Sequence, residues 1–90
     1  MATVLVLHRV KDYAKWREVY DSARQMQTAG GVTEEAAFRA EGDPLNVLVM
    51  HRFATLADAH AYFENPALAE AVRDAGVEEA TVRLEFYEEA

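Results

Sequence analysis

Two of the three histidines occupy the same place in two nearly identical apolar runs. Residues 4–10 read VLVLHRV and residues 47–53 read VLVMHRF, with His8 and His51 in matching positions. A histidine titrates near neutrality, and burial favours its neutral, proton-accepting form. The repetition therefore indicates either a base and its partner, or two imidazoles that hydrogen-bond each other or a buried tyrosine and complete a core.

These runs belong to a longer internal repeat, which predicts how the chain folds. At a constant offset of 43, identical residues recur between the copies, from Val4 and Val47 as far as Ala14 and Ala57. Two copies are too few for a solenoid, so each is interpreted as half of one domain spanning residues 1–90. Each half is expected to begin with a strand, continue with helix and end with a strand.

Capping and turn residues set the expected limits of these elements. Asp12, Thr55 and Asn65 are natural N-caps, the last followed by proline, and Gly76 is a stop signal. The expected strands are 4–10, 32–41, 47–53 and 80–88, with helical stripes at 13–26, 56–63 and 68–75 and a turn at 42–46. The order predicts an α+β, ferredoxin-like βαββααβ sandwich: a four-stranded antiparallel sheet with helices on one face. Strands 4–10 and 47–53 form its central pair.

Alternation along the strands places His8 and His51 on one face of that sheet, as near neighbours beneath the helices. We assign the more apolar side of every strand to this face, because buried apolar area stabilises by roughly 25 cal/mol per Å². For the second strand this assignment puts one set inward, Ala36, Phe38 and Ala40, and the other outward, Glu35, Ala37 and Arg39.

A pocket between sheet and helices follows from this arrangement. His8 and His51 are its candidate catalytic residues. The candidate substrate-binding residues are mainly aromatic: Trp16, Tyr20, Phe53, His60 and Phe63. A metal site is not expected, because His60 lies at the edge of its helix's inward stripe and three protein ligands normally converge at a catalytic metal.

The opposite face has an apolar centre of Leu5, Leu7, Leu48 and Met50, rimmed by Arg and Glu. Left bare, such a centre would be an exposed patch of the kind that marks an interface. We expect a homodimer in which two sheets pack face to face, with the helices outside.

Composition excludes several classes of function. Sixteen acidic against nine basic residues give a net charge of -7, which argues against nucleic acid and anionic membranes as partners. The absence of cysteine excludes disulfides, thiolate nucleophiles and Cys-built metal centres. The opening residues, MATVLVLHRVKD, do not read as a signal peptide, so a cytoplasmic protein is expected.

Residues 47–72, VLVMHRFATLADAHAYFENPALAEAV, resemble the antibiotic biosynthesis monooxygenase type of dimeric α+β barrel. The shared pattern is a strand ending in an aromatic, a capped helix with an inward Tyr-Phe, and a proline-led helix. Members typically hold substrate between sheet and helices. The superfamily includes cofactor-independent oxygenases of phenols and quinols, haem-degrading enzymes, polyketide cyclases, isomerases and proteins without known activity.

The resemblance implies a small-molecule enzyme of the cofactor-independent monooxygenase type, acting on an aromatic, quinol or polyketide-like compound without a cofactor. A cyclase or isomerase is the enzymatic variant, and a non-catalytic ligand-binding or structural dimer is the competing class. The haem-degrading branch carries an asparagine on its first strand. Residues 4–10 have none, which argues against haem chemistry. In the oxygenase account His51 or His8 deprotonates a phenolic substrate, whose anion reacts with dioxygen.

Overall fold

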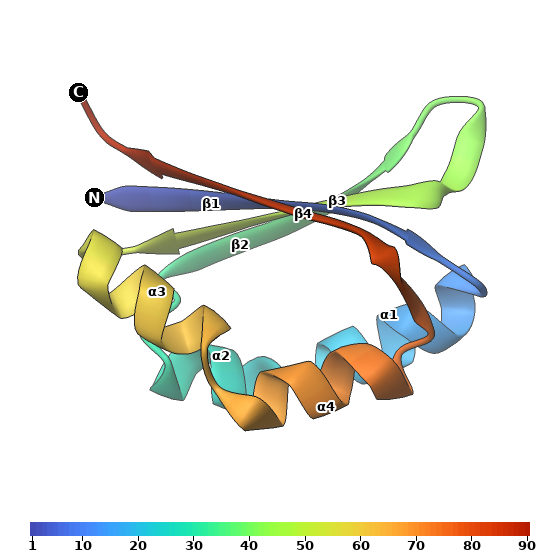
Figure 1. Ribbon diagram of the computed structural model, residues 1–90, viewed down its shortest axis with the longest axis horizontal. Coiled ribbons are helices and arrows are strands. Elements are labelled where there is room, and N and C mark those ends of the chain that lie inside the picture. The colour runs from blue at the N-terminus through green and yellow to red at the C-terminus, as the bar shows by residue number, and fades with distance from the viewer.

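One four-stranded antiparallel sheet and four helices make up the structure, a computed structural model that describes residues 1–90 (Figure 1). The strands are β1 (Ala2–Val10), β2 (Glu34–Ala40), β3 (Asp43–Phe53) and β4 (Val77–Glu88), in the order β2-β3-β1-β4. The helices are α1 (Tyr13–Ser22), α2 (Arg24–Ala29), α3 (Leu56–Phe63) and α4 (Pro66–Asp74). The predicted ferredoxin-like α+β class is confirmed, with β1 and β3 as the central pair.

All four helices lie on one side of the sheet, and the other side carries no element of the chain (Figure 1). The expected caps start three of these helices. Asp12 accepts from the Lys15 N–H at 3.2 Å, Thr55 accepts from the third backbone N–H beyond it, and Asn65 caps α4. Gly76, with φ at 74°, ends the last helical segment in a left-handed conformation that suits glycine. None of the helices has the length and apolar character needed to span a membrane.

The helix expected over 13–26 is instead two helices, α1 and α2, separated at Ala23. Ser22 Oγ donates to the Val19 carbonyl at 2.7 Å, and the Ala23 N–H bonds to the Tyr20 carbonyl at 3.2 Å. A serine that bonds back to the preceding turn often bends a helix. The bend carries the chain into α2, whose Gln27 is buried.

The register of the central strands confirms that His8 and His51 share the helix-covered face. His8 pairs with Val47 and His51 pairs with Val4, with Val6 opposite Val49 between them. Residues directly opposite each other in an antiparallel pair point to the same side. The inward assignment of β1 and β3 is therefore correct, and the pairing of β4 with β1 places Leu84 and Phe86 on the same face.

The face assignment of β2 is wrong by one residue. Glu35 pairs with His51, and Arg39 pairs with Val47, so the odd-numbered residues of β2 face the helices. Phe38, which was expected inside, pairs with Leu48 on the uncovered face and is 53% exposed. The assumption that the more apolar side of each strand faces the helices fails for β2. This strand lies at the edge of the sheet, and its more apolar side extends the uncovered apolar face.

The buried side chains form two clusters beneath the helices. One cluster surrounds Phe53 and Tyr62 under α3, and the other surrounds Trp16 and Val47 under α1 and the end of α4. Val6, at the centre of the sheet, packs against both. The two clusters pack against the two ends of the sheet and leave the middle of the helix-covered face for a cavity.

Candidate functional site

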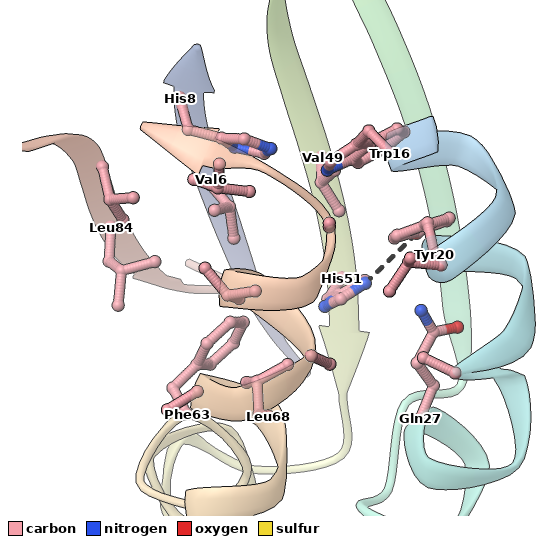
Figure 2. A pocket seen from close by; sticks show the side chains of 18 of the residues that line it. Val6, His8, Trp16, Tyr20, Gln27, Val49, His51, Phe63, Leu68 and Leu84 are labelled. Carbon is pink, nitrogen blue, oxygen red and sulfur yellow. Dashed lines mark hydrogen bonds between the residues drawn. The ribbon is translucent and has the colours of Figure 1, made fainter. Parts of the chain in front are cut away.

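A cavity of about 340 Å³ lies between the middle of the sheet and the helices (Figure 2). Val6, Val49 and Leu84 line it from the sheet, and the helices contribute mainly aromatic and aliphatic side chains. Sixteen of its twenty lining residues are hydrophobic, so a ligand that fills it must be largely apolar. The volume is in the range of small-molecule sites.

Solvent reaches the cavity beside β4. Leu7 pairs with Arg83 but Arg9 pairs with Glu78, so the intervening residues of β4 bulge away and His8 has no partner on that strand. Val82 within the bulge lines the cavity and is 38% exposed. Bulges recur next to binding sites because they terminate pairing locally. Here the bulge opens the helix-covered face at the His8 end.

The structure brings five of the seven candidate site residues together around this cavity: His8, Trp16, Tyr20, His51 and Phe63. Phe53 does not line it; this side chain is fully buried in the cluster under α3. His60 is exposed on α3, where its ring stacks on Phe86 at a centroid distance of 4.2 Å.

His8 and His51 both line the cavity but lie at different ends of it. Val4, the partner of His51, is four residues from His8 on β1, which is about 13 Å at the rise of a strand. Val6 and Val49 lie between them, so the imidazoles do not hydrogen-bond each other. The expectation that they are near neighbours is wrong, because the pseudo-two-fold axis passes through the Val6–Val49 pair and separates its two copies.

An aromatic wall connects the two histidines. The His8 and Trp16 rings are 5.8 Å apart between centroids, Trp16 stacks on Tyr20 at 4.8 Å, and Tyr20 stacks on His51 at 6.2 Å. Helical spacing on α1 places Trp16 and Tyr20 one above the other. Flat, offset aromatic surfaces of this kind suit an aromatic ligand.

Tyr20 also connects His51 to Glu35. The Tyr20 hydroxyl donates to Glu35 Oε1 at 2.5 Å, and its oxygen is 3.3 Å from His51 Nε2 (Figure 2). Glu35 reaches this position because it lies directly opposite His51 on β2. Glu35, like the cavity residues Gln27 and Tyr62, was not among the candidate site residues from the sequence.

Burial controls the protonation of both histidines. It lowers the pKa of His51 to about 4, against an opposing effect of the Glu35 carboxylate, and it lowers the pKa of His8 below 6.5. Both imidazoles are therefore neutral at pH 7. Burial, together with the bond to Glu35, raises the pKa of Tyr20 far above its usual range, so Tyr20 remains a neutral phenol.

Three buried polar atoms around the cavity have no hydrogen-bond partner in the protein: Nδ1 of His8, Nδ1 of His51 and the hydroxyl of Tyr62. Burial raises the pKa of Tyr62 to about 12, so it is a neutral phenol as well. In Figure 2 the second nitrogen of His51 lies on the side of the ring away from Tyr20, toward Phe63 and Leu68. Buried polar groups are nearly always paired, so these atoms are candidate partners for a ligand or water, which reaches them once a neighbouring side chain moves, because all three are covered. No group of three or more His, Asp and Glu side chains converges in a way that could hold a metal ion.

The amino-acid sequence matches no model of a known protein family, and no curated protein is similar to it at a significant level. Solved structures, in contrast, match over nearly the whole chain. A protein of Bordetella bronchiseptica, provisionally described as an antibiotic biosynthesis monooxygenase, superposes with a TM-score of 0.83 at 12% identity, covering 99% of this chain and 96% of that chain. A similarly described protein of Caulobacter crescentus gives 0.80 at 12% identity, covering 99% and 89%.

SnoaB, described as a cofactor-independent oxygenase of Streptomyces nogalater, superposes with a TM-score of 0.76 at 9% identity, covering 99% of this chain and 91% of that chain. Structural matches at sequence identities this low show that the fold is shared, and only that. The chain therefore has the fold of the antibiotic biosynthesis monooxygenase structures, and the resemblance stated from residues 47–72 is confirmed at that level.

Proposed function

We propose that this protein is a small-molecule enzyme of the cofactor-independent monooxygenase type, acting on an aromatic, quinol or polyketide-like substrate. The observation that carries the proposal is an apolar cavity of about 340 Å³ lined by the neutral His51, whose Nδ1 is buried without a partner in the protein. The described activity of SnoaB, which shares the fold, supports the same class of reaction.

His51 is the proposed base. A neutral imidazole accepts a proton from a phenol, or from the acidic methylene of an anthrone, when the nitrogen is within hydrogen-bond reach of it. The apolar walls contributed by Trp16 and Phe63 exclude water and orient the ring of the substrate. His8 and Tyr62 also line the cavity, and in this proposal they bond polar substituents of the substrate.

The reaction balances with dioxygen as the only oxidant. Deprotonation leaves an electron-rich carbanion or phenolate, which transfers one electron to dioxygen. The resulting radical pair combines to a peroxide, and loss of water leaves a carbonyl. For an anthrone the sum is CH₂ + O₂ → C=O + H₂O, which needs no metal, flavin or haem.

We also propose that the uncovered sheet face is a homodimer interface. Leu5, Leu7, Leu48 and Met50 form its half-buried centre, and the apolar side of β2 adds the exposed Phe38. Three of the four strand arginines have acidic partners within the chain, such as Asp43 for Arg9 at 2.7 Å, and Arg39 lies over the ring of Tyr13 on the helix-covered side, so the centre of the uncovered face remains apolar. A second copy covers such a face most simply.

Two measurements on the same sample test the proposed activity. Trp16 is the only tryptophan and lines the cavity, so its fluorescence reports binding when a panel of quinols and anthrones is added. Dioxygen uptake then reports turnover, which His51→Gln is expected to lower by about 10²- to 10⁴-fold. His60→Gln is the matched control, because the structure places this exposed histidine outside the cavity.

Each outcome separates the candidate classes. If the ligand quenches Trp16 fluorescence and dioxygen is consumed by the wild type but not by His51→Gln, the result supports the proposed enzyme. Quenching without uptake supports the non-catalytic ligand-binding class. Uptake that is equal in the wild type and in His51→Gln would show that His51 is not the base.

A further inference from the structure

We propose that Glu35 is a positioning residue that acts through Tyr20 to fix the tautomer of His51, so that Nδ1 is the nitrogen available to accept a proton. The contribution of this arrangement to turnover rests on the function proposed above. The tautomer itself is a property of the free protein.

The argument begins with the single proton of the Tyr20 hydroxyl. An ionised carboxylate has no proton to give and only accepts hydrogen bonds. The bond of 2.5 Å between Tyr20 Oη and Glu35 Oε1 therefore uses the hydroxyl proton of Tyr20. What Tyr20 offers His51, 3.3 Å away, is an oxygen lone pair.

A lone pair on Tyr20 requires a proton on the facing nitrogen of His51. That nitrogen is Nε2, so the neutral imidazole carries its one hydrogen there. Nδ1 is then an unprotonated acceptor, and it is the nitrogen that is buried without a partner in the protein. The hydrogen bonds at one edge of the ring thus determine which atom at the other edge is basic.

The position of Glu35 explains why a tyrosine lies between the carboxylate and the histidine. A second cavity, of about 260 Å³, is lined mostly by polar residues of α2 and of the segment that enters β2; Glu34, Glu35 and Thr28 line it, and Gln27 lines both cavities. A carboxylate directly in the apolar cavity would be costly to bury. Glu35 is half-buried at the polar cavity instead, and Tyr20 transmits its effect to His51.

The same arrangement favours the proton transfer itself. When a substrate C–H or O–H bond breaks and the proton bonds to Nδ1, His51 becomes a cation that still donates from Nε2 to Tyr20. The negative charge of Glu35, one side chain away, stabilises that cation. Glu35 forms no ion pair that would neutralise it.

The test is nitrogen NMR of the imidazole rings in protein labelled with ¹⁵N-histidine, without substrate. The wild type is expected to show His51 as the Nε2–H tautomer at neutral pH. Tyr20→Phe removes the acceptor and Glu35→Gln supplies a possible donor, so each is expected to move the two His51 signals toward a mixture of tautomers. Glu34→Gln is the matched control, because Glu34 lines the same polar cavity but pairs with Arg52 and forms no bond to Tyr20.

A wild-type spectrum with the proton on Nδ1 would overturn the proposal, and so would spectra of Tyr20→Phe and Glu35→Gln that are unchanged at His51. The His8 signals, at the other end of the cavity, report whether a variant has lost its fold. If the protein turns over an anthrone, Glu35→Gln is expected to lower kcat about tenfold or more with KM little changed. A correct tautomer in a protein that consumes no dioxygen would refute the proposed function and leave the inference about Glu35 intact.

Discussion

Replacing His51 with glutamine is expected to remove a large part of the acid sensitivity of this protein. The pKa of His51 lies at about 4 in the folded chain, against 6.5 for an ordinary histidine. Below pH 6.5 the unfolded chain therefore takes up a proton that the folded chain does not, and stability falls with pH. Each pKa unit corresponds to about 1.4 kcal/mol, so the wild type should lose about 3 kcal/mol through this group between pH 7 and pH 4.

Stability falls on acidification because burial lowers the pKa of His51 in the folded chain. A histidine whose folded pKa is lowered contributes stability that is complete above about pH 6.5 and is lost as the pH falls toward 4. His8, whose pKa burial also lowers, adds to the loss in both proteins and cancels in the difference. So does Glu85, whose pKa the hydrogen bond from Arg83 lowers and which lies on the uncovered face of the sheet, away from His51.

Urea denaturation of the wild type and His51→Gln at a series of pH values measures this difference. The wild type should lose stability more steeply than the variant as the pH falls, by an amount that approaches about 3 kcal/mol. His60→Gln should follow the wild type, because His60 is exposed. A gap between the wild type and His51→Gln that stays constant with pH, or one that widens in the opposite direction, would refute the reasoning.

Three further substitutions test other parts of the structure. Gly30→Ala should destabilise the protein by about 1–3 kcal/mol in urea denaturation, because an added Cβ overlaps the buried ring of Tyr62 and comes within 3.2 Å of the Met26 carbonyl oxygen; unchanged stability would show that the Tyr62 ring moves into the adjoining cavity. Thr55→Ala should cost about 1 kcal/mol by removing the side chain that caps α3, and a neutral result would exclude that cap as a source of stability. Met50→Glu should convert a dimer to a monomer in sedimentation velocity, and a wild type that is already monomeric would contradict the proposed interface.

The strand and helix order could be predicted from the sequence because local signals agreed with the repeat. Alternation in residues 4–10 and 47–53 placed both histidines correctly, and the caps at Asp12, Thr55 and Asn65 were where the structure has them. The break at Ala23 was missed because the apolar spacing continues across it. The bond from Ser22 to Val19 that bends the helix leaves no periodic signal.

Because the faces of β2 were assigned wrongly, the sequence interpretation placed Glu35 on the uncovered face and did not predict it as a site residue. Apolar character was the wrong guide for an edge strand whose apolar side lies on the uncovered face. Pairing gives a better signal: a turn at 42–46 places Glu41 opposite Val47, and this alone puts the odd-numbered residues of β2 on the face of His51. The observed hairpin is tighter, with Ala40 opposite Asp43, but a bulge around Pro44 restores the same parity.

The composition of the cavity could be predicted only in part. Helical spacing identified Trp16 and Tyr20, and the repeat identified His8 and His51. Phe53 and His60 were expected there because they share a strand face or a helix with cavity residues. Their exclusion depends on how α3 sits on the sheet: it buries Phe53 completely and turns His60 toward Phe86 and solvent.

The most direct test of the account is a crystal structure of the protein with an anthrone bound under anaerobic conditions, so that the ligand is not consumed. We expect the ligand between the sheet and the helices, beside the ring of Trp16, with its acidic carbon or hydroxyl within about 3.2 Å of His51 Nδ1. An anthrone bound on the uncovered face of the sheet, or in the cavity with its acidic group directed away from His51, would contradict the assignment of this site.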